Sequence, residues 1–261
     1  MGVRLERHGP LALVTGAAQG IGAALARALH QRGFRLVLVD QQGKRLTGLA
    51  RTLGGVETVV MDLAAPSAVD DLAAALEGRD LGLVVHNAAT SPFGPLVETD
   101  PARLEATLAV NTRVPLLLTR ALGPQLLARG RGGLVFMSSL IAMHGAPGFA
   151  AYAATRGFTL ALGESLWAEL RGSGLDVLVA CPGAVDTEGF RDLRPNRGAL
   201  RWTPVASPTA VAEEILEALG GGGPTRVVGL SSRLAERAFS LLPRGAASRL
   251  VASRVRRLYR R

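Results

Sequence analysis

Cysteine, lysine, aromatic residues and clusters of metal-binding side chains are all scarce in this chain of 261 residues. Its only cysteine, Cys181, cannot form an internal disulfide, and no group of histidine, cysteine and carboxylate residues has zinc-like spacing. No apolar run approaches the roughly 18 residues of a membrane-spanning helix, and the N-terminus lacks a signal-peptide pattern. These absences predict a cytoplasmic protein with no disulfide, no metal and no spanning helix.

Aromatic residues make up only 4% of the chain although hydrophobic residues make up 48%, so alanine, leucine and valine must fill the core. This composition suits helices packed closely on a sheet, and the length suits one large α/β domain.

Acidic residues are almost missing from the end of the chain, where the positive charge is concentrated. Residues 233–261 contain nine arginines and one glutamate, which accounts for +8 of the net charge of +9. The tail has neither interleaved aromatic residues nor a motif that reads bases. We therefore expect no nucleic-acid partner and a nearly neutral main body.

Short apolar runs alternate with segments of helical spacing through most of the chain. Four runs end at Gly16, Asp40, Asp62 and Asn87, and later strands are expected at 133–137, 176–180 and 226–228. Long helices are expected at 103–127, 152–170 and 209–219. The alternation predicts a doubly wound, Rossmann-type sheet of seven parallel strands with helices on both faces.

A glycine-rich turn joins the first predicted strand to the first helix. In Thr15-Gly16-Ala17-Ala18-Gln19-Gly20-Ile21-Gly22 the glycines allow the backbone to approach a diphosphate, which the helix N-terminus attracts. Asp40 ends the next strand, where a carboxylate binds ribose hydroxyls and repels a 2′-phosphate. The pattern favours NAD over NADP, although Lys44 and Arg45 keep NADP open.

Tyr152 and Arg156 lie four residues apart on one helix face, thirteen residues after Ser139. A phenol has a pKa near 10, and lowering it by about 3 units corresponds to about 4 kcal/mol. A cation at about 4 Å supplies roughly that much at an effective dielectric of about 20. The pair therefore suits proton transfer.

These motifs together resemble the short-chain dehydrogenase/reductase family over roughly residues 8–230. The family's TGxxxGIG turn is present in full, its NNAG motif appears as His86-Asn87-Ala88-Ala89, and Arg156 stands where the family has lysine. The resemblance implies an oligomer, a dimer or tetramer formed through the long helices. It assigns catalysis to Asn111, Ser139, Tyr152 and Arg156, and cofactor binding to Gly16, Ala18, Gln19, Gly20, Ile21, Gly22, Asp40, Asp62, Leu63, Asn87, Ala88, Ala89, Tyr152, Arg156, Pro182, Gly183, Val185 and Thr187.

Arginine at position 156 admits three interpretations. It keeps the positive charge of lysine but is a wide planar group that does not release its proton. Lys44 is the only lysine in the chain, so the arginine fits a general drift that leaves a slower enzyme. The alternatives are a cofactor-binding protein that has lost turnover and an engineered substitution.

Two further segments follow the predicted active site. Residues 187–207 carry four arginines, Phe190 and Trp202 without clear periodicity, and we interpret them as a substrate lid, with a solvated connection as the alternative. Residues 231–261 form an arginine-rich helical extension of the domain 1–230, with apolar stripes at Leu234, Ala238, Leu241 and at Val251, Val255, Leu258. Such a helix can lie on an anionic membrane, or it can pack on the body or on a neighbouring subunit.

The sequence thus predicts an NAD(P)-dependent oxidoreductase that interconverts a secondary alcohol and a ketone, with a small hydrophobic molecule as substrate. An acidic group on that substrate could face the arginines of the lid. The alternative is a catalytically impaired NAD-binding protein that acts through its basic tail at a membrane or partner surface. Both interpretations place the protein in the cytoplasm. The second interpretation adds peripheral contact with the inner membrane surface.

Overall fold

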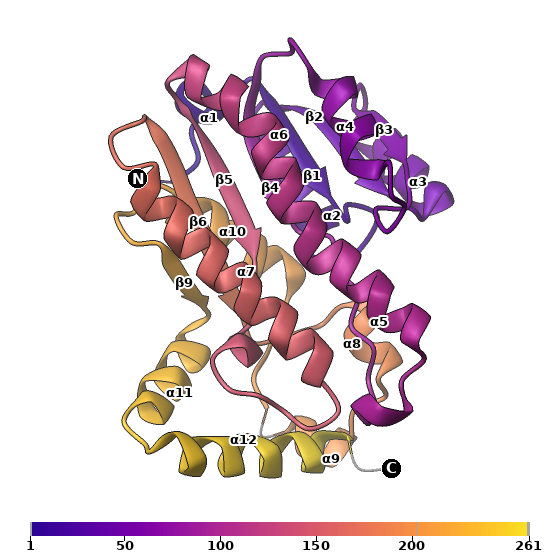
Figure 1. The fold of residues 1–261 in the computed structure, drawn as a ribbon, viewed down its shortest axis with the longest axis vertical. Helices are drawn as coiled ribbons and strands as arrows, with labels where there is room; N and C mark the ends of the chain where they lie inside the picture. Colours follow the sequence, from indigo (N-terminus) through magenta and orange to yellow (C-terminus); the bar gives the residue numbers. More distant parts are fainter. Residues whose placement is uncertain (1, 202, 260–261) are drawn as a thin grey trace.

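The computed structural model describes residues 2–201 and 203–259. Its main sheet has seven strands, all parallel, in the order β3-β2-β1-β4-β5-β6-β9 (Figure 1). Their bounds are β1 Leu11–Thr15, β2 Arg35–Asp40, β3 Glu57–Val60, β4 Leu81–His86, β5 Gly132–Met137, β6 Leu175–Pro182 and β9 Thr225–Val228. The predicted doubly wound fold is confirmed.

Helices cover both faces of this sheet. The first face carries α2 (Gly20–Gln31), α3 (Gly43–Leu53) and α10 (Pro208–Ala218). The second carries α4 (Ala68–Leu76), α6 (Val114–Arg129) and α7 (Ala150–Glu169). Because both faces are buried, the central strands are apolar at every position rather than at alternate ones.

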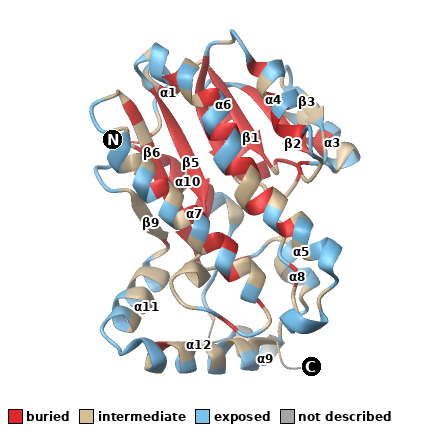
Figure 2. Cartoon of the chain, in the orientation of Figure 1, coloured by how far each residue is buried: buried red, intermediate tan, exposed pale blue. Residues whose placement is uncertain are grey.

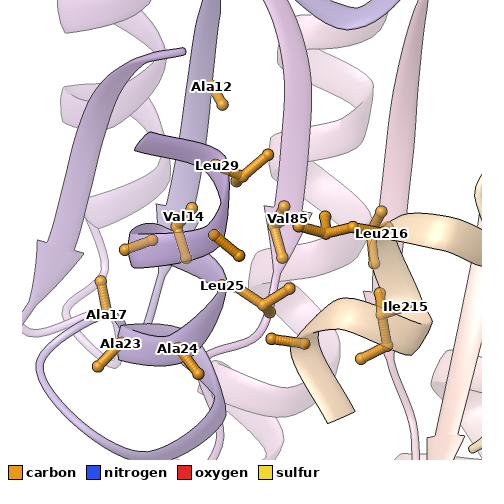
Figure 3. Close-up of a cluster of buried hydrophobic side chains, with 14 of the residues drawn as sticks. Ala12, Val14, Ala17, Ala23, Ala24, Leu25, Leu29, Val85, Ile215 and Leu216 are labelled. Carbon is orange, nitrogen blue, oxygen red and sulfur yellow. The ribbon is translucent and has the colours of Figure 1, made fainter. Parts of the chain in front are cut away.

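Alternation within one strand divides the core into two layers. Ala12 and Val14 of β1 pack under α2 and α10, whereas Leu11 and Leu13 face the α4 and α6 side. Figure 3 shows the first layer, where small alanines of α2 let its backbone lie close to the sheet while Leu25 and Leu29 fill the remaining space. The alanine-rich composition therefore reflects close helix-to-sheet packing.

The long helix predicted at 103–127 is divided in the structure. It consists of α5 (Pro101–Leu108), a π-helical turn (Ala109–Arg113) and α6. Pro115 has no N–H to donate to the carbonyl of Asn111, so the regular hydrogen bond is missing at this point. The Thr159 hydroxyl donates to that carbonyl instead, at 3.3 Å.

The remaining elements lie mainly beyond the carboxyl ends of the strands. Segment 187–207 is more regular than expected, because it contains α8 (Glu188–Asp192), α9 (Arg197–Leu200) and β8 (Val205–Ala206), which pairs with β7 (Ala184–Val185). Trp202 lies outside the described residues. Short helical turns complete the chain at α1 Leu5–His8, η1 Leu96–Glu98 and η3 Leu140–Ala142.

The basic tail forms two helices, α11 (Leu230–Ser240) and α12 (Arg244–Tyr259). In Figure 1 they lie at the lower end of the molecule, with α12 running across it beside α9. Figure 2 shows that α12 is partly covered on its inner side and exposed on its outer side. Within the described ranges, no helix has the length and apolarity needed to cross a membrane. The domain boundary at residue 230 stays a prediction.

Candidate active site

The glycine turn after β1 is held tightly against the end of β4. The Asn87 side-chain amide donates to the carbonyls of Thr15 and Gly16 at 2.9 and 3.0 Å. A Cβ at Gly16, whose φ is +66°, would lie 2.7 Å from the Cα of Ala88, and one at Gly22 would lie 2.0 Å from the Gly16 oxygen. Only glycine fits these two positions, and the turn opens directly onto the N-terminus of α2.

Asp40 connects this turn to the end of β2. Its carboxylate is buried and accepts from the backbone N–H groups of Ala18 at 3.0 Å and Gln42 at 2.9 Å. Arg45 donates to the side chain of Gln19, so a cation also lies beside the turn. The arrangement fits the predicted dinucleotide, since backbone N–H groups at a helix N-terminus suit a diphosphate.

Other predicted cofactor residues follow β3 and β6. Asp62 is exposed and accepts from the N–H of Ala64 at 2.9 Å, while Leu63 is buried. Thr187 caps α8 by accepting from the N–H of Phe190 at 3.2 Å. A Cβ at Gly20 would lie 3.0 Å from the Thr187 methyl group, so the glycine turn and the loop after β6 face each other closely.

A cavity of about 570 Å³ opens at the carboxyl ends of the central strands. It brings together ten of the predicted residues, namely Ile21, Asn87, Ala89, Ser139, Tyr152, Arg156, Pro182, Gly183, Val185 and Thr187. The cavity lining does not include Gly16, Ala18, Gln19, Gly20, Gly22, Asp40, Asp62, Leu63, Ala88 or Asn111. Ala88 and Asn111 instead line a small void behind it, together with Arg156.

The two predicted catalytic hydroxyls come from different elements. Ser139 follows β5 in an extended conformation, and its Oγ lies 3.5 Å from the Pro182 carbonyl and 3.4 Å from the N–H of Ile141. Tyr152 lies in the first turn of α7, with its ring 6.3 Å from that of Phe149. Both side chains line the same cavity.

Arg156 is 2% exposed, yet only one of its three nitrogens has a protein partner in the described part of the chain. Nη1 donates to the Met137 carbonyl at 2.5 Å, while Nε and Nη2 are buried without a partner. The guanidinium carbon lies 4.9 Å from the centroid of the Tyr152 ring. A full positive charge therefore lies beside the tyrosine, with two donors still available for a bound group or water.

Asn111 lies behind this pair and is almost completely buried. Its amide donates to the Thr90 carbonyl at 2.9 Å and to the Thr155 hydroxyl at 3.0 Å, and its oxygen accepts from the Thr90 N–H at 2.9 Å. The side chain thus connects the loop after β4 to α7. Asn111 therefore helps to hold in place the helix that carries Tyr152 and Arg156.

His86 is structural, as expected for a histidine at the end of an apolar strand. Its ring stacks on Phe136 with centroids 4.8 Å apart, and Nε2 lies 3.0 Å from the Thr119 hydroxyl. Burial lowers the pKa of His86 to about 3, so the ring is neutral at physiological pH.

The sequence pattern did not assign any residue of the tail to the site, yet tail residues line one side of the cavity, which we call its roof. They come from α11 and α12 and comprise Ala235, Phe239, Val251, Arg254, Val255, Leu258 and Tyr259. The stripe Val251, Val255, Leu258 was visible in the sequence, but its partner surface was not. The other stripe is largely exposed instead, since Leu234 and Leu241 are 58% and 86% exposed.

Tyr259 anchors the end of this roof. Its ring lies 5.0 Å from that of Phe93 and 5.5 Å from that of Phe149, which in turn contacts Tyr152. The Asn196 N–H donates to the Leu258 carbonyl at 2.7 Å and ties α12 to α9. Burial raises the pKa of Tyr259 to about 12, so its phenol stays neutral and acts as an apolar wedge.

Comparisons with known proteins agree with this geometry. The profile of the short chain dehydrogenase family matches residues 10–198. The 1-deoxy-11-beta-hydroxypentalenate dehydrogenase of Streptomyces exfoliatus is 39% identical over 218 residues, covering 80% of this chain and 79% of the relative.

Solved structures extend the likeness to nearly the whole chain. A 7beta-hydroxysteroid dehydrogenase superposes with a TM-score of 0.88 at 25% identity, covering 96% of this chain and 99% of the other. A short-chain dehydrogenase from Sphingobium yanoikuyae in complex with NADPH superposes with a TM-score of 0.80 at 27% identity, covering 93% and 95%. The glycine turn, the Ser139 and Tyr152 hydroxyls, the parallel sheet and these likenesses lead to one conclusion: the chain belongs to the short-chain dehydrogenase family of oxidoreductases.

Proposed function

We propose that this protein transfers hydride reversibly between NAD(H) and a secondary alcohol or ketone with an apolar body. The observation that carries the proposal is that Ser139 and Tyr152 share a cavity with Ile21, Asn87 and Thr187 from the cofactor side. The rest of the lining is mostly apolar, including Ile141, Phe149, Phe190 and Leu193. Such walls exclude water and favour an apolar substrate.

The roles of the side chains follow from their chemistry. When bound, the nicotinamide supplies or accepts the hydride. Tyr152 gives its proton to the carbonyl oxygen during reduction and removes the hydroxyl proton during oxidation, and Ser139 donates a hydrogen bond to the same oxygen. Asn111 holds α7 in place through Thr155, which fixes Tyr152 relative to Ser139.

Arg156 supports the interpretation as an active but slower enzyme. Its charge lies over the ring of Tyr152, and its two unpartnered donors are available to ribose hydroxyls. Because guanidinium does not release its proton, Arg156 cannot pass protons on as an ammonium can. Proton exchange with solvent is therefore the step that arginine slows.

Substitutions at these two positions test the proposal. Tyr152→Phe removes the proton donor, and we expect kcat to fall by about 10²- to 10⁴-fold while the Kd for NADH stays within about threefold. Arg156→Lys restores a group that exchanges its proton, and we expect kcat to rise. The measurement is steady-state absorbance of NADH with a panel of apolar and small polar ketones.

Arg171→Lys is the matched control, since Arg171 lies just beyond α7 and contacts Trp167 rather than the site. Unchanged kinetics in this control and altered kinetics in Arg156→Lys support a role at the reacting oxygen. If neither the natural chain nor Arg156→Lys turns over any ketone while both still bind NADH, the dehydrogenase proposal is overturned.

We propose NAD as the preferred cofactor because the Asp40 carboxylate lies at the glycine turn, where it repels a 2′-phosphate. Two observations favour NADP: Arg45 beside Gln19, and the NADPH in the similar Sphingobium enzyme. The balance between a fixed carboxylate and one nearby guanidinium decides the preference.

The expected result is a kcat/KM at least about tenfold higher with NADH than with NADPH. Arg45→Ala should weaken whatever NADPH use exists and leave NADH kinetics unchanged. Arg51→Ala, an exposed arginine of the same helix, serves as the control. A higher kcat/KM with NADPH in the natural chain contradicts the preference.

We also propose that the protein is a dimer or tetramer assembled through its long helices. Five large apolar side chains on α5, α6 and α7 are between about a third and a half exposed: Leu108, Leu116, Leu117, Leu127 and Phe158. A second copy that covers them removes this surface from water.

Light scattering after size-exclusion chromatography tests the assembly. The natural chain should elute as a dimer or tetramer, and the double variant Leu116→Glu/Leu117→Glu should shift toward monomer. Val97→Glu, which alters a fully exposed valine outside these helices, should not shift. A monomeric natural chain at micromolar concentration would disprove the assembly.

A second candidate function, an NAD-binding protein that acts at an anionic membrane through residues 233–261, has one observation in its favour. On α11 the side chains of Leu230 and Leu234 are exposed, as is Leu241 just beyond it, and exposed arginines stand nearby at 237 and 244. The apolar side of α12 lines the cavity instead, so α11 is the side left to contact lipid.

Co-sedimentation with vesicles containing phosphatidylglycerol distinguishes this candidate. If it holds, the natural chain sediments with anionic vesicles but not with neutral ones, and Leu234→Glu/Leu241→Glu lowers the bound fraction at least fivefold. Leu96→Glu alters an exposed leucine on the body and should have no effect. Binding that the double variant leaves unchanged argues against contact through α11.

A further inference from the structure

The roof of the cavity contains one cation that the proposed reaction does not use. Arg254 of α12 lines the cavity between the apolar residues Val251 and Val255. Its guanidinium carbon lies 5.3 Å from the centroid of the Phe239 ring, which also lines the cavity. No carboxylate of the described residues lies within ion-pair distance of Arg254.

A second polar group stands against the same aromatic ring. His144, in the loop after Ser139, contacts Phe239 edge-on with ring centroids 5.8 Å apart, and it too lines the cavity. Its Nδ1 is buried and has no hydrogen-bond partner among the described residues. Phe239 therefore has Arg254 on one side and His144 at its edge, at a place where the remaining walls are apolar.

The arginines of segment 187–207 whose side chains the structure describes do not fill this role. Arg191 makes two hydrogen bonds to Asp186, at 2.7 and 2.8 Å, and neither it nor Arg194 lines the cavity. Phe190 and Leu193 of that segment point apolar groups toward the cavity instead. An acidic group on the substrate, which the sequence led us to expect opposite the lid arginines, would therefore face Arg254 of the tail instead.

We propose that the substrate is an apolar molecule with a carboxylate remote from the reacting carbon, and that Arg254 binds this carboxylate. The inference rests on the proposed function and names its substrate class. Ser139 and Tyr152 belong to the β5 loop and α7, whereas Arg254 belongs to the roof helix, so the two ends of one molecule meet different elements. Arg254 is an exposed residue that lines the cavity, its guanidinium carbon lies over the Phe239 ring there, and its paired N–H groups suit a carboxylate.

The outer face of α12 adds to the effect without contacting the substrate. Arg249, Arg256 and Arg257 are exposed on the same helix. Their summed positive potential raises the local concentration of anions at the cavity entrance. An acidic substrate is therefore drawn to the opening and fixed at Arg254.

Kinetics with a matched acid and ester test the proposal. The probes are 4-(4-oxocyclohexyl)benzoate and its methyl ester, which share the ketone and the apolar body but differ in charge. We expect the natural chain to show a lower KM for the acid. Arg254→Leu should raise the KM for the acid by about 10- to 100-fold with kcat changed less than about threefold, and should leave the ester unchanged.

Two variants separate recognition from general damage. Arg254→Lys keeps the charge and should recover part of the acid preference, while Arg257→Leu on the exposed side of the same helix should behave as the natural chain. Equal KM values for acid and ester in the natural chain would overturn the proposal. An equal loss for both probes in Arg254→Leu would do the same.

Direct binding keeps this test independent of turnover. Calorimetry with 4-cyclohexylbenzoate and its methyl ester, which lack the ketone, should show the acid bound more tightly by the NADH-saturated protein and this preference lost in Arg254→Leu. Acid preference without turnover of any ketone would refute the proposed reaction and uphold the carboxylate site. Turnover without acid preference would refute the carboxylate site alone.

Discussion

All seven strands of the main sheet run in one direction, so their carboxyl ends meet at one edge. Both faces of such a sheet must be covered, which commits the helices to the two sides and leaves only that edge free for ligands. Gly16, Asp40, Asn87 and Ser139 each lie at or just beyond the end of a different strand, and they come together because these strands end at the same edge of the sheet. The cavity, its roof and the chemistry proposed for it all depend on this parallel arrangement.

At this edge of the sheet, Arg156 has an unusual environment for a buried cation. A buried cation is costly unless hydrogen bonds and a counter-charge replace its water, and here one carbonyl and the face of Tyr152 are its protein partners. The unpartnered Nε and Nη2 are characteristic of a site built to receive something else. In the proposed mechanism, Arg156 provides the positive charge, and it differs from a lysine in shape and in its inability to exchange a proton.

The tail forms one side of the cavity. The Ser139 and Tyr152 hydroxyls and the glycine turn belong to the sheet ends and to α7, whereas residues of α11 and α12, from the last thirty or so of the chain, line the cavity opposite them. Tyr259 secures this side of the cavity by packing against both Phe93 and Phe149, which also contact each other. In the proposed function, the reaction and the choice of substrate are therefore carried by separate parts of the chain.

Much of the fold follows from local patterns. The apolar runs that end at Asp40 and Asn87 predict strands, the glycines of the turn predict a close backbone approach, and Tyr152 four residues before Arg156 predicts a shared helix face. Pro115 has no N–H to donate, which explains the π-helical turn at Asn111, although the sequence pattern led us to expect one unbroken helix there. These features depend on residues close together in the sequence, so the sequence by itself determines them.

Other features depend on contacts between distant parts of the chain. The stripe Val251, Val255, Leu258 suits a membrane, a partner or the body equally well, and only the packed structure sets it over the cavity. Likewise, Arg191 and Arg254 have the same side chain in different surroundings. Arg191 is paired with Asp186, whereas Arg254 lies over the Phe239 ring. An amphipathic pattern specifies that a face will be buried but does not name its partner, and that choice was made by the tertiary structure.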